Sequence, residues 1–358
     1  MANINNTEIA SEIIPILKKY EADRIKSLLL FTLITIAIIV FNIIQRDIFG
    51  YNQNMFRGFF IFFLTLTILV MTVVVPIWLA YILINHSFAN KIKKECMPEI
   101  LKNFKNIKWL KQKPIITNDE IQDSELFGVF NSRINDDGFS GKYKNTNFKV
   151  QEISLLNEAS SVRNKMIWPV FDGVIIIVES NKYIKNKTIV TTKNDINTRN
   201  SNPLLWITIL LIIYGTYIIF ETPIAIIATV FIIGLVILYS IHEKKTKEKL
   251  SKITLEDPEF NKKYNMYSSD QIEGRYLVTT AFMERFKNMH TAFGSNKAKC
   301  AFFDDKIMFS ISTTKNLFEI GNIFTPLGNK RQINIFLEEI SSIYAIIDYF
   351  KLTEELGL

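Results

Sequence analysis

The chain has 358 residues, which is enough for two soluble domains or for one domain and a membrane part. Apolar residues make up 48% of the chain and 28 residues are phenylalanine, which favours the membrane alternative. Only two cysteines are present, Cys96 and Cys300, and their distant positions argue against a disulfide framework and against a zinc site. The frequent use of Ile, Asn, Lys and Phe suggests an AT-rich bacterial genome.

Two apolar segments near the N-terminus predict a transmembrane hairpin. Residues 1–26 are polar, and a short amphipathic helix is expected there before the first segment. Residues 27–45 carry no charge and form the first expected span. The second uncharged run covers residues 58–90 and contains Pro76. Because neighbouring helices in lipid can absorb a proline kink, one span over residues 59–83 is expected.

A second pair of apolar segments organises the rest of the chain. Residues 200–220 and 222–242 contain no Asp, Glu, Lys or Arg, and each run is long enough to span a bilayer core. The two runs meet at Glu221 and predict a second transmembrane hairpin over residues 201–242. This hairpin cuts a polar region of mixed α and β character into two pieces.

The basic residues beside the four spans predict their orientation. Most of them lie before span one, after span two and after span four. The two loops on the other side of the membrane contain only two of them, Arg46 and Arg57. Since positive residues favour the cytoplasmic side, both termini and both large polar segments should lie in the cytoplasm. The expected location is a bacterial inner membrane, with several passes. The four expected spans contain no Asp, Glu, Lys or Arg within their apolar runs, and because ion and proton pathways usually place such groups facing a cavity, this argues against a transporter or channel.

Residues 86–117 predict a basic juxtamembrane helix, which Pro98 is expected to break or restart. Apolar residues recur every four positions between lysines: Phe88, Ile92, Cys96, Ile100 and Phe104. The plain interpretation is a stalk whose lysines within residues 91–113 meet water and lipid headgroups. The alternative is specific recognition of an anionic lipid, although each lysine near an anionic surface contributes about 1 kcal/mol without selecting a headgroup.

The polar piece before the second hairpin shows mainly strand patterns. A helix is expected over residues 118–130, capped by Asn118 or Asp119, and a β-hairpin is expected from strands 141–144 and 148–153. A further strand covers residues 171–179. It is apolar on both faces and therefore central, and residues 187–192 are its expected partner.

The polar piece after the second hairpin adds helices and one strand pair. A helix starts at Gln271, with Asp270 and Glu273 as a capping box. Strands 299–303 and 307–311 form a hairpin, and a last helix covers residues 332–352. The apolar stripe of the first helix comprises Ile272, Tyr276, Thr279, Met283, Phe286, His290 and Phe293. The seam of the last helix comprises Ile333, Phe336, Ile340, Ile343, Ile347 and Phe350.

Neither polar piece supplies enough apolar cover for its own sheet. The predicted fold class is therefore α+β: a membrane protein with four transmembrane helices in two hairpins and one cytoplasmic domain of antiparallel sheet and helices, split by the second hairpin. The expected parts are residues 1–26 (cytoplasmic N-terminal segment), 27–85 (transmembrane hairpin 1), 86–117 (basic juxtamembrane helix), 118–200 (first part of the domain), 201–242 (transmembrane hairpin 2) and 243–358 (second part of the domain).

The sequence shows no catalytic or metal-binding constellation, so no catalytic residue, metal or cofactor is predicted. Of its three histidines, His86 and His242 end expected spans, and His290 lies on an apolar helix stripe. The run GFSGKY at residues 138–143 lacks the spacing of a phosphate loop and leads into a strand instead of a helix.

The densest polar cluster lies within residues 256–276. Its carboxylates near an arginine could bind a ligand or perform acid–base chemistry, whereas the plainer interpretation is a capped helix start with ion pairs inside the domain. Because Tyr and Arg are enriched among residues that dominate interfaces, the cluster is also a candidate interaction surface. Its members are Asp257, Tyr267, Asp270, Glu273, Arg275 and Tyr276.

Four blocks of sequence carry a resemblance to a known family. They are GKYKNTNFKVQE (141–152), FDGVIIIVESNKYIKNKTIV (171–190), LEDPEFNKKYNMYSSDQIEGRYLVTTAFMERF (255–286) and FFDDKIMFSISTTKNLFE (302–319). In this order they resemble a bacterial domain-of-unknown-function family, number 3137. This chain departs from the family by placing residues 201–242 between blocks that are usually joined more directly. The resemblance implies a pair of N-terminal spans and a LemA-like membrane protein as a partner, and it carries no established activity or functional residue.

The leading hypothesis is a bacterial inner-membrane protein whose cytoplasmic domain binds another protein or the membrane surface. Its expected partners are the lipid bilayer, anionic headgroups near residues 91–113 and a LemA-like membrane protein, and no nucleic acid is expected. The alternative is a ligand sensor or enzyme that uses the polar cluster of residues 257–276.

Overall fold

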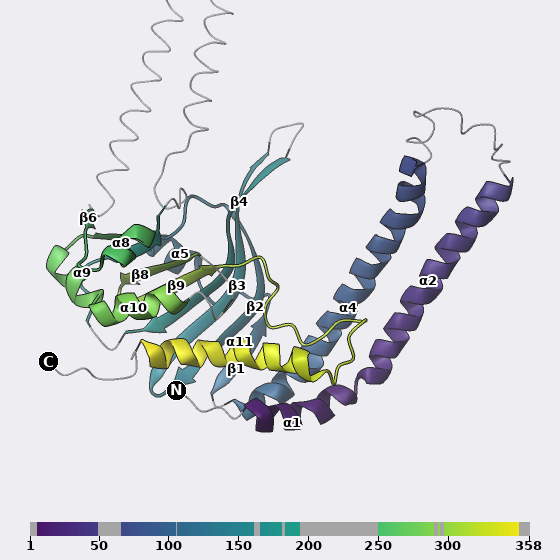
Figure 1. Cartoon of the computed structure of the whole chain (residues 1–358), viewed down its shortest axis with the longest axis horizontal. Coiled ribbons are helices and arrows are strands. Elements are labelled where there is room, and N and C mark those ends of the chain that lie inside the picture. Colours follow the sequence, from purple (N-terminus) through teal and green to yellow (C-terminus); the bar gives the residue numbers. More distant parts are fainter. Residues whose placement is uncertain are drawn as a thin grey trace, which may run out of the picture. The chain divides into compact units, whose positions relative to one another are not determined.

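The computed structural model describes residues 6–48, 66–104, 106–160, 165–180, 183–193, 250–289, 293 and 297–350 (Figure 1). The chain divides into two compact units. The first comprises Met1–Trp109 and Asn316–Ala345, and the second comprises Leu110–Lys315 and Ile346–Leu358. Residues 201–242, predicted to form the second transmembrane hairpin, lie outside the described residues.

The first unit is built on two long apolar helices. α1 (Asn6–Lys18) leads into α2 (Glu21–Ile48), and α4 (Val75–Ile100) runs back along α2 (Figure 1). Near one end of the pair Lys91 Nζ lies 2.7 Å from Asp23 Oδ2, and near the other end Asn42 Nδ2 donates to the Thr72 carbonyl at 3.2 Å. The two helices are therefore antiparallel. Among the described residues, the stretches Glu21–Ile44 and Leu66–Asn103 are long and apolar enough to cross a membrane.

Pro76 is accommodated with the help of the neighbouring helix. A proline has no N–H, so the carbonyl four residues earlier, that of Thr72, loses its usual helical donor. The chain forms a short π-helical stretch, η2 (Val70–Val74), at this point, and Asn42 of α2 donates to the Thr72 carbonyl. A polar group that would be costly to leave unpaired in lipid thus has a partner.

The apolar stripe that the sequence predicts at residues 88–104 is buried, and most of it lies on α4 beyond the apolar run of that helix. The five residues of the stripe are at most 5% exposed: Phe88, Ile92, Cys96, Ile100 and Phe104. The expected break at Pro98 is wrong, because Pro98 lies within the continuous last turn of α4. The helical path ends in a 3₁₀ turn, η3 (Leu101–Asn103). Asn106 then takes a positive φ of 57° and the chain continues as strand β1 (Ile107–Lys111), so the helix does not extend to residue 117.

The second unit is organised around a nine-stranded sheet of order β1-β2-β3-β4-β9-β8-β5-β7-β6. Each pairing with a described register is antiparallel, which confirms an α+β fold with a large antiparallel sheet. The strands after β1 are β2 (Ser132–Tyr143), β3 (Thr146–Ser160), β4 (Lys165–Glu179), β5 (Thr188–Thr192), β6 (Ser251–Ile253), β7 (Tyr264–Ser268), β8 (Ala298–Phe303) and β9 (Lys306–Ser312).

Strands from both polar pieces of the sequence alternate within this sheet. β4 pairs with β9, and β5 pairs with both β7 and β8, so backbone hydrogen bonds join the two pieces. The prediction that residues 187–192 pair with residues 171–179 is wrong, because the β8–β9 hairpin lies between β5 and β4. Strands that follow one another in sequence usually pair, and nothing local in the sequence signals this insertion.

The two predicted β-hairpins are confirmed, and both have two-residue turns. Lys144 and Asn145 join β2 to β3 with φ of 43° and 70°, and Asp304 and Asp305 join β8 to β9 with φ of 45° and 55°. Positive φ at both central residues is typical of the turns that match the twist of paired strands, and Asn and Asp tolerate it well.

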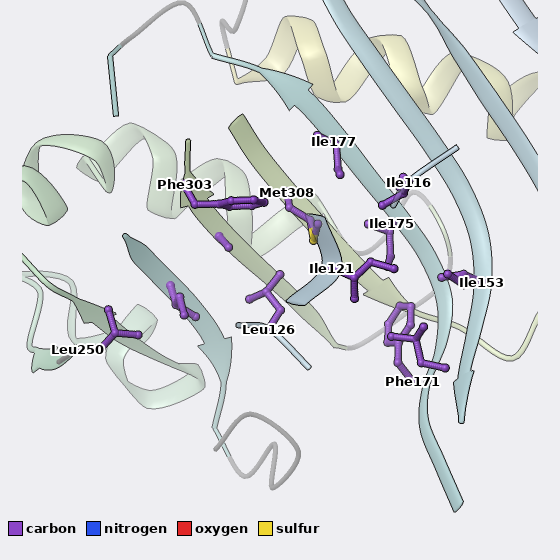
Figure 2. Packing of buried hydrophobic residues seen from close by; sticks show 13 residues of the cluster. Ile116, Ile121, Leu126, Ile153, Phe171, Ile175, Ile177, Leu250, Phe303 and Met308 are labelled. Carbon is purple, nitrogen blue, oxygen red and sulfur yellow. The ribbon is translucent and has the colours of Figure 1, made fainter. Parts of the chain in front are cut away.

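Both faces of β4 are buried from Val174 to Val178, as expected for a central strand. Ile175 and Ile177 belong to an apolar cluster on one face, together with Ile121 of α5 (Asn118–Asp123) and Met308 of β9 (Figure 2). Successive side chains of a strand alternate, so Ile176 points to the other face, and it is also fully buried.

α5 covers the cluster of Figure 2 and is shorter than the predicted helix 118–130. Its cap is Thr117, one residue before the predicted cap, and Thr117 forms a capping box with Glu120. The helix stops because Ser124 Oγ donates to the Ile121 carbonyl and accepts the Leu126 N–H, while Glu125 takes a φ of 52°. This turn directs Leu126 into the apolar cluster.

Glu120 attaches α5 to the sheet. Its Oε1 lies 2.8 Å from Lys149 Nζ of β3 and 3.4 Å from Lys306 Nζ of β9. Burial raises the pKa of the Glu120 carboxyl, but the hydrogen bonds from Lys149 and from the Thr117 backbone, with the nearby positive charges, hold the pKa below its ordinary value. The carboxylate is therefore charged at neutral pH.

Aromatic side chains cover the opposite face of the sheet. The ring of Phe282 in α10 (Thr280–Met289) lies 5.4 Å from the ring of Phe302 and 5.1 Å from that of Phe350, and Phe350 lies 4.8 Å from Phe309. Phe350 is the last residue of the predicted seam and lies one residue past the end of the last helix, α11 (Lys330–Tyr349); all six predicted seam residues are at most 8% exposed. The seam prediction is therefore confirmed.

The helix predicted from Gln271 onwards is interrupted. The structure divides it into α9 (Gln271–Leu277) and α10, because Val278 leaves the helical conformation and Thr279 Oγ1 accepts the Phe282 N–H as a new cap. The single apolar stripe is consequently wrong at its start. Ile272 is 83% exposed, whereas Phe286 is fully buried.

Candidate functional site

Asp257, the first residue of the predicted interaction surface, joins two helices. Its Oδ1 accepts the backbone N–H groups of Glu259 (2.8 Å) and Phe260 (3.1 Å), so Asp257 caps α8 (Pro258–Lys263). Its Oδ2 lies 2.8 Å from Lys287 Nζ of α10. The hydrogen bonds from Lys287 and from the Phe260 N–H hold the pKa of Asp257 below its ordinary value. The partner of this carboxylate is therefore Lys287, not Arg275.

Asp270 and Glu273 shape the start of α9. Asp270 Oδ1 accepts the N–H groups of Ile272 (2.7 Å) and Glu273 (3.1 Å), which confirms Asp270 as a helix cap. Glu273 does not complete a capping box. Its carboxylate instead accepts the Lys185 N–H (2.8 Å) and the Asn186 side-chain amide (2.5 Å). Glu273 thereby fixes the loop before β5 against α9.

α9 lies very close to β7. A Cβ added at Gly274 would come within 2.9 Å of the Met266 and Ser268 side chains, so only glycine fits there without a shift. Tyr267, the neighbouring member of the predicted surface, is half-buried and packs against the cluster of Figure 2. Successive side chains of a strand alternate, so Tyr267 lies on the face of β7 opposite to Met266 and Ser268 and supports the sheet instead of contacting α9.

The outward face of α9 carries the exposed members of the predicted surface. Arg275 is exposed, Tyr276 is 44% exposed, and Ile272 is 83% exposed. Ile272, Arg275 and Tyr276 are called the α9 surface below. The sequence pattern missed Ile272, because it assigned this residue to a buried helix stripe. An exposed isoleucine beside a tyrosine and an arginine is suited to contact with another protein.

A group of three carboxylates lies at a bulge in β2, and the sequence patterns did not single it out. Asp136 and Asp137 occupy the register shift between Asn135 and Gly138, opposite Glu152 of β3. Carboxylate oxygens of the three lie within 4.8 Å of one another, and Asp137 is fully buried. Such oxygens are ligands for hard cations, but three carboxylates alone do not define a metal site.

The structure describes two of the remaining sequence candidates, His86 and the run at residues 138–143. His86 is exposed on α4, with the Asn90 side-chain amide 3.1 Å from its ring nitrogens. His242 and His290 lie outside the described residues. Residues 138–143 belong to strand β2, which confirms that they are not a phosphate loop.

Comparison with protein families gives one match. A family model described as protein of unknown function (DUF3137) matches residues 169–352, from β4 past the end of α11. No curated protein and no solved structure matches the chain. Because the matched residues are more than half of the 358-residue sequence, the chain belongs to the family of proteins of unknown function DUF3137.

Proposed function

We propose that this protein is a membrane-anchored binding protein, in which α2 and α4 cross a bilayer and the α9 surface binds another protein. The observation that carries the binding function is the α9 surface itself, where Ile272 is 83% exposed on a helix that caps and tight packing hold in place. A surface that is already ordered loses little entropy when it binds a partner.

The lengths and surfaces of α2 and α4 support the membrane assignment. The stretch Glu21–Ile44 has 24 residues. At 1.5 Å per residue its uncharged part, residues 27–44, is about 27 Å long, which is close to the hydrocarbon core of roughly 30 Å. Its apolar side chains point outward, for example Leu33 (63% exposed) and Phe41 (60% exposed). Apolar side chains of α4 also point outward, for example Leu83 (69% exposed). In water such surface costs about 25 cal/mol per Å² of apolar area, and lipid removes that cost.

The proposal extends to the topology that the sequence predicts. Residues 201–242 supply two further spans, residues 118–200 and 243–358 form one domain, and the termini and this domain face the cytoplasm of a bacterial inner membrane. The support is the distribution of basic residues beside the apolar runs. The lysines proposed to reach anionic headgroups within residues 91–113 include the exposed Lys94 and Lys102, whereas Lys91 pairs with Asp23 and Lys93 with Glu319.

The α9 surface offers the chemistry of a protein interface. Tyr276 and Arg275 are of the residue types that contribute most to interface affinity, and Ile272 adds apolar area between polar neighbours. A LemA-like membrane protein is the first partner to test. The carboxylates of Asp257, Asp270 and Glu273 bind groups of the same chain, which favours a binding surface over an acid–base site.

Photo-crosslinking in native membranes tests the α9 surface. A benzophenone amino acid at Ile272 of the full chain is expected to give a discrete adduct with one protein, because this side chain would be buried on binding. Arg275→Ala in the same chain should reduce the adduct severalfold. Since Arg275 is exposed, the Arg275→Ala substitution should change the free energy of unfolding by no more than about 0.5 kcal/mol.

A benzophenone at Thr314, which is exposed elsewhere in the second unit, is the matched control and is expected to give no such adduct. Equal adducts from Ile272 and Thr314, or none from Ile272 in a stably folded protein, would contradict the proposal. A loss of protein abundance with Arg275→Ala would show that Arg275 supports the fold instead.

A further inference from the structure

An uncharged loop from late in the chain belongs to the first unit. Residues 320–329 lie between Glu319 and Lys330 and contain no acidic or basic side chain. Glu319 is fixed at the start of the loop, since its Oε1 lies 2.7 Å from Lys93 Nζ of α4 and the Lys93 side chain is only 4% exposed. The loop therefore starts from an anchored position beside the apolar helices.

Polar side chains of α2 and α4 hold the loop by its backbone. Arg24 Nη1 donates to the Ile323 carbonyl (2.8 Å), and Asn85 Oδ1 accepts the Ile323 N–H (3.1 Å). Glu21, which also binds Arg24, accepts the Leu327 N–H through Oε2 at 3.1 Å. The two helices, which are distant in sequence from the loop, thus bind its backbone before and after the tip, at Ile323 and at Leu327.

The tip of the loop places Phe324 against the apolar parts of both helices. Its ring stacks on Tyr81 of α4 with centroids 5.3 Å apart, and it meets Phe31 of α2 edge-on at 5.6 Å. Phe31 and Tyr81 lie within the two uncharged runs 27–45 and 58–90. Phe324 is nevertheless 54% exposed, so its outer surface continues the outward-facing apolar surface of the helices.

The backbone of this tip is suited to a medium with little water. The N–H groups of Phe324 and Thr325 both donate to Asn322 Oδ1 at 2.9 Å. The N–H groups of Ile323 and Leu327 are bound by Asn85 and Glu21, and residue 326 is a proline, which has none. Every backbone N–H from residue 323 to residue 327 is therefore satisfied within the protein, which lowers the cost of bringing this tip to the edge of a bilayer.

We propose that residues 323–326 are a third membrane-contacting element, which inserts Phe324 into the headgroup–acyl boundary of the bilayer beside α2 and α4. This inference rests on the proposed membrane function of those two helices. The loop also links the two helices, because its backbone binds Arg24 and Glu21 of α2 and Asn85 of α4, close to the ends of the two uncharged runs. Aromatic residues are enriched at this depth of membrane proteins.

Nitroxide labelling of the full chain in phosphatidylcholine–phosphatidylglycerol vesicles tests the insertion. Single labels are placed at Phe324→Cys, at Leu83→Cys on the exposed side of α4, and at Thr314→Cys in the second unit. Collision with oxygen, which partitions into lipid, is compared with collision with a water-soluble nickel chelate. The oxygen-to-nickel ratio at residue 324 is expected to exceed that at residue 314 severalfold and to approach that at residue 83.

The outcomes separate this proposal from the one on which it rests. A water-like ratio at residue 324 with a lipid-like ratio at residue 83 would overturn the insertion and leave the membrane helices intact. Water-like ratios at both would overturn both. If Phe324→Cys does not fold, a label at the exposed Pro326 keeps the native ring, and a lipid-like ratio there supports the proposal while a water-like ratio contradicts it. Cys96 and Cys300 are fully buried, so the unmodified chain supplies the background.

Discussion

Replacing Gly173 with alanine is expected to lower the free energy of unfolding of the sheet by about 3 kcal/mol or more, or to prevent folding altogether. Gly173 lies in β4 opposite Ser312 of β9 and has a φ of 150°, which side-chain-bearing residues rarely adopt. A Cβ there would lie 2.2 Å from the Ile311 carbonyl oxygen and 2.9 Å from the Thr313 nitrogen. Both contacts are with backbone atoms, so a rotamer change cannot relieve them.

The measurement is urea unfolding of the purified full chain, followed by circular dichroism, together with its yield in membranes. Gly328→Ala is the control, because the nearest atom to its added Cβ is Lys18 Cε at 3.4 Å. The control should stay within about 0.5 kcal/mol of the unmodified protein. A Gly173→Ala protein that unfolds at the same urea concentration as the control would contradict the β4–β9 register described above.

Replacing Phe286 with alanine is expected to cost about 3–5 kcal/mol of the free energy of unfolding. Phe286 is fully buried in α10, and its ring lies 5.0 Å from that of Tyr264, 5.6 Å from that of Phe282 and 6.2 Å from that of Phe260. Removal of the ring leaves a cavity among these neighbours, because they come from α8, β7 and α10 and cannot all move inward. The midpoint of urea unfolding should fall accordingly.

Ile272→Ala is the matched control for this second prediction. Ile272 is a large apolar residue on α9, but it is 83% exposed, so its removal should change the free energy of unfolding by no more than about 0.5 kcal/mol. Equal losses for the two variants would contradict the division of the segment into a buried support and an exposed surface. A stable Ile272→Ala protein would also be suited to binding experiments.

Local patterns predicted those elements that depend on few long-range contacts. The seam of α11, the stripe of α4 and both hairpins follow from apolar periodicity and turn residues, and the structure confirms them. β4 was recognisable because apolar residues on both faces require a central position. The pairing of β5 could not be predicted from the sequence, because its neighbours β7 and β8 come from the other polar piece, after the segment 194–249. The grouping of Asn316–Ala345 with the N-terminal helices likewise depends on contacts between distant residues.

In the candidate site, too, contacts between residues close in sequence could be predicted and contacts between distant residues could not. Asp270 could be recognised as a cap because its partners are the next two N–H groups in the chain. The partners of Asp257 and Glu273 are Lys287 and the loop at Lys185, which only the folded chain brings close. Ile272 was assigned to the core because helical spacing cannot show that Val278 interrupts the helix. The most exposed member of the surface was therefore missing from the predicted set.

Thiol labelling from the two sides of a membrane tests most directly whether α2 and α4 cross it. In sealed right-side-out vesicles, an impermeant maleimide should label Asn52→Cys, between the two apolar runs, without permeabilisation. Lys94→Cys, exposed on α4 beyond its apolar run, should react only after permeabilisation. The native thiols give no signal, because Cys96 and Cys300 are fully buried and burial raises the pKa of Cys300 well above its ordinary value. Labelling of both engineered cysteines from the outside, or of neither until the vesicles are opened, would contradict the membrane-crossing hairpin on which this account depends.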